Sequence, residues 1–345
     1  MNDENTLLEV KNLKVSFHLT EGTVQAVDGV SFTVDAGKTL GIVGESGCGK
    51  SVTARAILGM VRPPGKITDG EILYHRKYGG VVDVAKLPAD SDEIHRIRWG
   101  EIAMIFQEPM TSLSPVHTIG NQMIEAIQLH KDVSKSAAES VSVDLMRRVG
   151  LATPERLLRQ YRHELSGGMR QRVMIAMALT CSPRLLIADE PTTALDVTTQ
   201  SQILNLMRDL QDEYRMAIMF ITHNLGVIAE MADNVIVMYL GKEVEVADVD
   251  TLFHGPAHPY TQALMRSIPR HDVKIDRLET IKGSVPDPTA IPSGCAFHPR
   301  CPHYQPKTCN VEPSLISVSE NQQVRCSRVF ELNQHLAAPQ AELPK

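Results

Sequence analysis

Residues 44–51 carry the strongest chemical signal in this chain of 345 residues. They follow the pattern Gly-x-x-x-x-Gly-Lys-Ser, in which glycines let backbone N–H groups turn toward phosphate oxygens. Residues 39–43 predict a buried strand before the pattern, and residues 52–60 predict a helix after it, whose N-terminus also favours anions. A glycine-rich turn can match by chance, but these flanks favour a phosphate-binding loop. The residues predicted to contact a nucleotide here are Gly44, Ser46, Gly47, Cys48, Gly49, Lys50, Ser51 and Val52.

Two side chains of this loop and two carboxylates predict magnesium-dependent hydrolysis. Lys50 should reach the β- and γ-phosphates, and the Ser51 hydroxyl should ligate Mg²⁺. Asp189, which follows the apolar stretch 185–188, is the second expected metal ligand. Glu190 comes next and could polarise an attacking water. Adjacent carboxylates usually mark only a solvated loop, but here they close a predicted buried strand in a chain with a phosphate-binding loop.

Gln107 and His223 follow two further predicted strands, at 102–106 and 217–221. The carboxyl ends of parallel strands share one edge of a sheet, so both side chains are expected at the rim of the phosphate-binding loop. There His223 could contact the γ-phosphate, and Gln107 could contact Mg²⁺ and the water. A lone histidine is more often structural, yet this position favours a catalytic role.

A second glycine-rich helix start lies at residues 165–171, which read Leu-Ser-Gly-Gly-Met-Arg-Gln. Ser166 is a plausible N-cap, and with Gly167 and Gly168 it offers free N–H groups to an anion. One nucleotide needs only one such cradle from its own subunit. The second cradle therefore suggests a site for the nucleotide of another subunit.

The elements that must position these residues form an α/β pattern. Residues 7–17 and 24–34 alternate apolar and polar, like strands of an antiparallel sheet, and residues 118–160 have a helical pattern. Between 185 and 239 strands alternate with helices, which predicts a parallel sheet with helices on its faces. Phe17 precedes the phosphate-binding loop, and its ring either stacks on a base or is an ordinary strand aromatic.

The α/β pattern ends near residue 246, and prolines, histidines and cysteines then accumulate. We predict a nucleotide-binding core at 1–247, with a helical subdomain at about 108–182, and a separate, irregular C-terminal appendage at 248–345. A net charge of −6 and 4% aromatic residues argue against a nucleic-acid surface. The sequence contains no apolar run of about 18 residues, the length that could span a membrane. The polar N-terminus is also unlike a secretory signal, so a cytoplasmic protein is expected.

Four of the six cysteines lie in this appendage, which in a cytoplasmic protein favours a metal or redox role over disulfides. They are Cys295, Cys301, Cys309 and Cys326. Four thiolates suit a tetrahedral zinc ion or an iron–sulfur cluster. The close cysteine pairs of zinc sites are absent, and the Cys301-Pro302 step fits a cluster better, with zinc and no metal as alternatives. Cys48 and Cys181 are interpreted as packing or loop residues.

Together, these motifs resemble those of the ATP-binding subunits of ABC transporters. In chain order the matching segments are Phe17 (A-loop aromatic), 44–51 (Walker A), Gln107 (Q-loop), 165–171 (signature, with Met169-Arg170 before the glutamine), 185–190 (Walker B with the catalytic glutamate), 194–196 (D-loop) and His223 (switch histidine).

Further stretches resemble the peptide/nickel subfamily, which includes the dipeptide and oligopeptide importers. These are 106–113 and 188–196 in the core and 258–264 and 294–302 in the tail, so the resemblance covers nearly the whole chain. One departure is Asn224, where the family usually has aspartate.

This resemblance implies a P-loop ATPase core with an antiparallel β subdomain and a helical subdomain, which binds ATP and Mg²⁺. Two ATP-binding subunits, usually different chains, would face each other head to tail, each ATP lying between one subunit's Walker A and the other's signature. The implied partners are two membrane permease subunits and an extracytoplasmic substrate-binding protein, with no nucleic acid. A [4Fe–4S] cluster in the tail and a peripheral position on the cytoplasmic face of the inner membrane are also implied.

The cargo is the least determined feature, because the permease and the binding protein choose it. Peptides are expected, and nickel or oligosaccharides are the alternatives. A non-transport ABC ATPase that acts on ribosomes or DNA is a different class. Such proteins usually have two cassettes or a long coiled-coil insertion, and this chain has neither.

Overall fold

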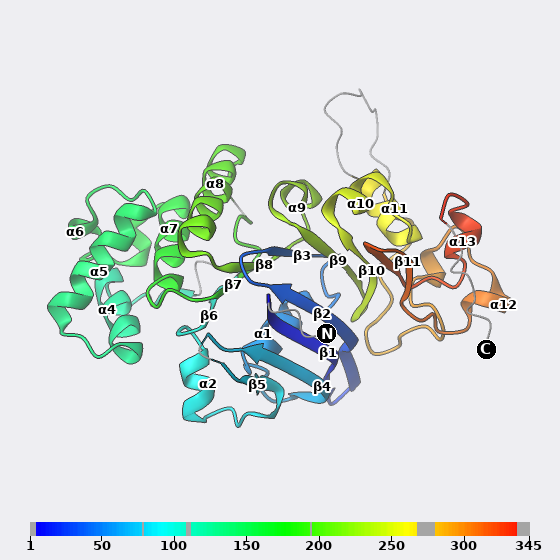
Figure 1. Cartoon of the computed structure of the whole chain (residues 1–345), viewed down its shortest axis with the longest axis horizontal. Helices are drawn as coiled ribbons and strands as arrows, with labels where there is room; N and C mark the ends of the chain where they lie inside the picture. Colours follow the sequence, from blue (N-terminus) through cyan, green and yellow to red (C-terminus); the bar gives the residue numbers. More distant parts are fainter. Residues whose placement is uncertain (1–4, 78, 108–111, 194, 268–279, 337–345) are drawn as a thin grey trace.

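Two β-sheets organise the chain, which the computed structural model describes at residues 5–77, 79–107, 112–193, 195–267 and 280–336 (Figure 1). The larger sheet has the order β11-β12-β10-β9-β3-β8-β7-β6, and the smaller has the order β2-β1-β4-β5. The strands are β1 (Thr6–Leu19), β2 (Gly22–Asp35), β3 (Thr39–Val43), β4 (Gly65–His75), β5 (Val81–Asp83), β6 (Ile102–Ile105), β7 (Leu185–Asp189), β8 (Ala217–Thr222), β9 (Asn234–Tyr239), β10 (Lys242–Asp248), β11 (Ile316–Ser319) and β12 (Gln322–Val324). The α-helices are α1 (Lys50–Ile57), α2 (Asp92–Ile97), α4 (Ile119–His130), α5 (Lys135–Arg148), α6 (Pro154–Leu157), α7 (Gly167–Ala178), α8 (Val197–Tyr214), α9 (Leu225–Met231), α10 (Val249–His254), α11 (Pro259–Arg266), α12 (Pro306–Cys309) and α13 (Val329–Leu332).

Parallel strands β9-β3-β8-β7-β6 form the centre of the larger sheet. Successive side chains point to opposite faces, so each strand supplies two hydrophobic clusters. Ala188 and Phe220 belong to the cluster that includes residues of α7, α8 and α9. Ile187 and Met219 belong to the cluster that includes residues of α1. The predicted α/β class, with helices on both faces of a parallel sheet, is therefore confirmed.

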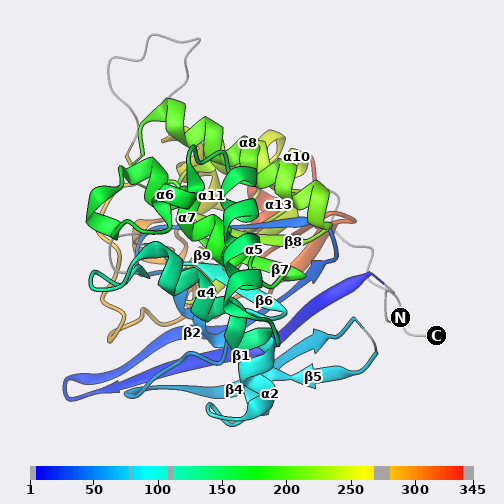
Figure 2. The ribbon, with the colours of Figure 1, turned by 90° about the vertical axis from the view of Figure 1, so that its left-hand side faces the viewer.

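The smaller sheet is antiparallel, as the alternation at 7–17 and 24–34 predicted. β1 pairs with β2 on one side and with β4 on the other. Leu8 and Val10 of β1 and Val30 of β2 are buried in the same cluster as Ile57 of α1. Helix α1 shares this cluster with strands of both sheets and begins shortly after the end of β3. In Figure 2 the labelled strands of the smaller sheet lie below strands β6–β9 of the larger one.

Helices α4, α5 and α6 lie together at one end of the molecule, beside α7 (Figure 1). Hydroxyl N-caps begin two of them: Thr118 accepts the N–H of Asn121, and Ser134 accepts the N–H of Ala137. Their core is continuous with α7 through residues such as Met123. The predicted helical subdomain begins at 108, but residues 108–111 lie outside the described residues, and its bounds stay a prediction.

The C-terminal segment joins the larger sheet directly. β10 pairs antiparallel with β9, and β12 pairs with β10. Arg325 and Glu243 form a largely buried ion pair of 2.8 Å across this junction. The expectation of an irregular tail is thus corrected, because a β-hairpin and several short helices occupy it, while the boundary at 247/248 stays a prediction. Within the described ranges, no helix is both long and apolar enough to cross a membrane.

Candidate functional site

The phosphate-binding loop connects β3 to α1, as the sequence predicted. Close backbone contacts require glycine at two of its positions. A Cβ atom at Gly44 would lie 2.3 Å from the carbonyl oxygen of Met238, and one at Gly49 would lie 2.3 Å from that of Ala26. Gly49 also has a φ of 102° and is the N-cap of α1. The glycines therefore fix both the path of the loop and its entry into the helix.

Lys50 is almost fully buried, and its ammonium group lies inside the loop. Its Nζ donates to the carbonyl oxygens of Gly44 at 2.7 Å and Glu45 at 3.0 Å. Beside it, the Ser51 hydroxyl donates to Asp189 Oδ1 at 3.1 Å. Burial raises the pKa of the Asp189 carboxyl, while the hydrogen bond from Ser51 opposes the rise. Two of the three predicted magnesium ligands, Ser51 and Asp189, are thus in contact at the end of β7, where oxygen ligands suit Mg²⁺.

Glu190 is the centre of a hydrogen-bond network at the same sheet edge. Gln107 Nε2 donates to Glu190 Oε2 at 3.1 Å, and His223 Nδ1 lies 3.1 Å from Glu190 Oε1. Burial alone would raise the pKa of Glu190, but hydrogen bonds from His223, Thr193 and Gln107 outweigh it and lower the pKa below its usual value. The residues that the sequence placed in separate motifs therefore surround one ionised carboxylate.

Glu190 also has unusual backbone geometry. Its φ of 48° lies in the left-handed region, which is unfavourable for a residue with a side chain, and its N–H donates to Ile221 O at 2.8 Å. Backbone strain of this kind persists where the surrounding structure holds the residue in place. The strained backbone in turn sets the direction of the Glu190 carboxylate.

Asn224, the departure from the family pattern, keeps a structural role. Its side-chain oxygen accepts the N–H of Gly226 at 2.9 Å and caps α9. Asparagine and aspartate are equally good N-caps, so the exchange leaves the segment after His223 in place.

Two predicted nucleotide contacts lie on separate elements. Ser166 caps α7 by accepting the N–H of Met169 at 3.3 Å, so Gly167 and Gly168 form the first turn of that helix. On β1, the ring of Phe17 covers Gly65, where an added Cβ would lie 2.6 Å from it. The roles of Ser166 and Phe17 toward a nucleotide stay predictions.

Sequence reasoning missed three residues at this site. The Thr193 hydroxyl donates to Glu190 Oε2 at 2.9 Å. Tyr260 and Arg300 of the C-terminal segment both contact Glu45 in the phosphate-binding loop. Thr193 could have been noticed as a hydroxyl three residues after the predicted catalytic carboxylate, whereas no local signal connects residues 45 and 300.

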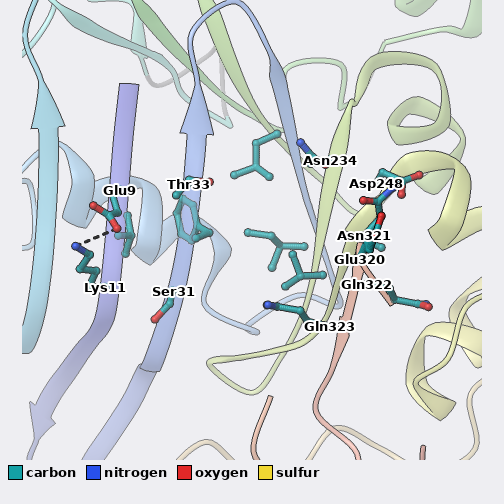
Figure 3. Close-up of a pocket in the computed structure, with 16 residues that line it drawn as sticks. Glu9, Lys11, Ser31, Thr33, Asn234, Asp248, Glu320, Asn321, Gln322 and Gln323 are labelled. Atoms are coloured by element: carbon teal, nitrogen blue, oxygen red, sulfur yellow. Dashed lines mark ion pairs between the residues drawn. The ribbon is translucent and has the colours of Figure 1, made fainter. Parts of the chain in front are cut away.

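A separate hollow of about 650 Å³ lies between the two sheets (Figure 3). Glu9, Ser31 and Thr33 line it from the smaller sheet, and Asp248 of β10 and Gln323 of β12 line it from the larger sheet. It contains none of the residues predicted to bind a nucleotide.

The four cysteines of the tail lie around one small cavity, but their side chains are not arranged as a metal site. Cys295, Cys301, Cys309 and Cys326 all line this cavity. Burial raises the pKa of Cys326 to about 11. In the part of the chain that the structure describes, no group of three or more His, Cys, Asp or Glu side chains is arranged to hold a metal ion. Both alternatives that the sequence left open, a zinc ion and an iron–sulfur cluster, therefore stay predictions.

Comparison with known proteins agrees with the motifs. The family described as "ABC transporter" matches residues 27–193, and that described as "Oligopeptide/dipeptide transporter, C-terminal region" matches residues 244–309. The oligopeptide transport ATP-binding protein AppD of Bacillus subtilis (strain 168) is 50% identical over 323 residues, which covers 93% of this chain and 96% of AppD. The dipeptide transport ATP-binding protein DppD of the same strain is 47% identical over 321 residues, covering 93% and 94%.

A solved structure supports the same assignment. The ATP-binding cassette MJ0796, described as a dimer in a post-hydrolysis state bound to ADP and Pi, aligns with a TM-score of 0.61 at 26% identity. The alignment covers 70% of this chain and 99% of that one. By its motifs, its fold and these relatives, the chain belongs to the ABC transporter family, in the group of oligopeptide and dipeptide transport ATP-binding proteins.

Proposed function

We propose that this chain hydrolyses ATP to drive the import of peptides across the cytoplasmic membrane. The observation that carries the proposal is the Glu190 carboxylate, which Gln107, Thr193 and His223 hold at the same sheet edge as the Ser51–Asp189 contact. A fixed, ionised carboxylate beside a phosphate-binding loop is suited to activate water for attack on a phosphoryl group. AppD and DppD are named for oligopeptide and dipeptide transport, which supports peptides as the cargo.

In this mechanism the side chains share the tasks of binding the phosphates and activating water. Lys50 moves its ammonium group from the loop carbonyls to the β- and γ-phosphates of ATP. Glu190 accepts the proton of the attacking water, while His223 orients the carboxylate and contacts the γ-phosphate. Mg²⁺, held by Ser51, Gln107 and Asp189, would supply positive charge to offset the phosphates.

The assembly follows from the second anion cradle at the start of α7. Ser166, Gly167 and Gly168 would contact the ATP of a second ATP-binding subunit, which we infer to be a different homologous chain. Two membrane permeases and an extracytoplasmic substrate-binding protein would complete the importer, placing this chain on the cytoplasmic face of the inner membrane. The dimeric description of MJ0796 supports the pairing of cassettes.

Peptide import is tested with the chain purified together with its membrane partners and reconstituted in vesicles. With ATP on the cassette side and the binding protein on the other, labelled di- and oligopeptides should accumulate only during hydrolysis. Ser166→Arg should block accumulation, because the arginine would occupy the cradle for the partner's ATP, and this chain should still bind its own ATP. Transport of nickel or an oligosaccharide instead of peptides would contradict the cargo, and a chain that recruits no membrane partner would contradict transport.

We further propose that the four-cysteine cavity holds an iron–sulfur cluster of the [4Fe–4S] type. Four thiols around a shared cavity support this, since a cubane binds each cysteine through a different iron and does not need their sulfurs to meet at one point. The Gln305 N–H also donates to Cys309 Sγ at 3.4 Å, a contact that stabilises a thiolate. Such a cluster would tie the loops of the tail together.

This second proposal predicts a coloured protein. Chain purified without oxygen should be brown and contain about four iron and four sulfide per chain. Cys301→Ser should bleach it, because a hydroxyl is a poor ligand at neutral pH, whereas Cys181→Ser, outside the cavity, should not. A colourless protein with stoichiometric zinc, or with no metal, would refute the cluster.

A further inference from the structure

The C-terminal segment contacts the phosphate-binding loop through an ion pair across 255 positions of sequence. Arg300 Nη1 donates to Glu45 Oε2 at 2.6 Å, and Nη2 donates to Glu45 Oε1 at 3.1 Å. The Arg300 side chain is only 4% exposed. This two-point geometry fixes both the distance and the direction of the Glu45 carboxylate.

A second contact from the same segment holds the backbone of the loop. The N–H of Glu45 donates to the Tyr260 hydroxyl oxygen at 3.0 Å. The Tyr260 ring packs against the rings of Tyr239 and Phe297, with centroids 4.7 and 5.3 Å away. Its helix is fixed in turn by buried His258, whose Nδ1 accepts the Tyr260 N–H at 3.0 Å.

Glu45 is consequently held at three points. Tyr260 accepts its N–H, Lys50 donates to its carbonyl oxygen, and Arg300 binds its carboxylate. A carboxylate at the second position of a phosphate-binding loop would repel a triphosphate if its charge were not balanced. Arg300 balances that charge and draws the side chain toward the tail.

We propose that Arg300 and Tyr260 are positioning residues for the phosphate-binding loop, through which the C-terminal segment sets the affinity of this site for ATP. The inference rests on the proposed ATP hydrolysis and deepens it. Neither residue need touch the nucleotide, because both act through Glu45. Arg300 directly precedes Cys301, so the segment that lines the cysteine cavity also holds the loop.

The test compares Arg300→Met, Glu45→Gln and the double variant in the full-length chain with its partners. Kd for ATP is measured by equilibrium binding, and KM and kcat are measured by phosphate release. Arg300→Met should raise Kd and KM about 10-fold or more, because it leaves an unpaired carboxylate in the loop, and it should change kcat much less. Adding Glu45→Gln should restore Kd most of the way, since no unpaired charge then remains.

Arg325→Met is the matched control, because Arg325 also joins the tail to the core through a 2.8 Å ion pair, with Glu243, and does not bond to the loop. It should lower the melting temperature without raising Kd for ATP. Tyr260→Phe keeps the ring packing and removes the hydroxyl that accepts the Glu45 N–H, so it should raise Kd for ATP a few-fold. This variant tests the positioning role if Arg300→Met does not fold.

An equal rise of Kd in Arg325→Met, or no rescue by Glu45→Gln, would refute the positioning role. A wild-type chain that binds ATP without hydrolysing it would refute the proposed function. The Kd values of the variants for ATP would still test whether Arg300 and Tyr260 position the loop.

Discussion

Replacing Glu190 with glutamine is expected to lower ATP turnover by about a hundred- to ten-thousand-fold while leaving ATP binding intact. Glutamine has the same size and can still accept the hydrogen bonds of Thr193 and Gln107, so the local structure should persist. It cannot take a proton from water. The pKa of Glu190 lies below its usual value, so the wild-type carboxylate is ionised at neutral pH, and the base is lost only as pH falls through that lowered value.

The measurement combines steady-state phosphate release with equilibrium binding of ATP. We expect the variant to retain ATP in a closed pair of cassettes and to release ADP very slowly. Glu21→Gln is the matched control, because Glu21 is exposed in the turn between β1 and β2 and should leave turnover unchanged. Rapid release of ADP by Glu190→Gln would mean that another group activates the water.

The parallel core could be predicted from sequence because its signals are local. Strands such as β7 are continuous apolar runs, which is what burial on both faces of a parallel sheet requires. A polar residue directly after such a run must lie at the carboxyl edge of the sheet. Gln107, Glu190 and His223 were placed by this rule, and the structure brings these three side chains into contact.

Other features depend on contacts between distant residues and could not be predicted in the same way. The tail was expected to be irregular because prolines and short polar stretches hide the weak signal of the strands β11 and β12. Those strands form because β10 presents a free edge with which β12 pairs. The ion pair between Glu45 and Arg300 likewise has no periodic signature, since each residue alone is an ordinary charged side chain in a loop.

The cysteine spacing illustrates an intermediate case. Sequence correctly grouped Cys295, Cys301, Cys309 and Cys326, which line one cavity in the structure. Spacing could not specify whether the sulfurs meet at one point or surround a space. That difference depends on the path of the loops between them, which the spacing does not encode.

Replacing Lys50 with alanine is expected to reduce ATP turnover by at least about a hundred-fold, because the developing charge on the phosphates loses its nearest cation. In the structure Lys50 Nζ is occupied by the carbonyls of Gly44 and Glu45. These contacts hold the ammonium group inside the loop, within reach of the place where phosphates would bind. Unlike Glu190→Gln, this variant should also bind ATP more weakly.

Lys50→Ala removes the buried stem of the side chain together with its ammonium group, so a folding defect from the emptied space must be separated from a loss of charge. Lys50→Met keeps the buried stem and removes only the ammonium group, and it should lose turnover to nearly the same extent. Lys66→Met, an exposed position on β4, should retain full activity. If Lys50→Met kept near-normal turnover and a normal melting temperature, Lys50 would be a structural residue of the loop. If both Lys50 variants lose turnover with unchanged melting temperatures, charge is the cause, and the loop carbonyls serve only to hold the ammonium group until ATP binds.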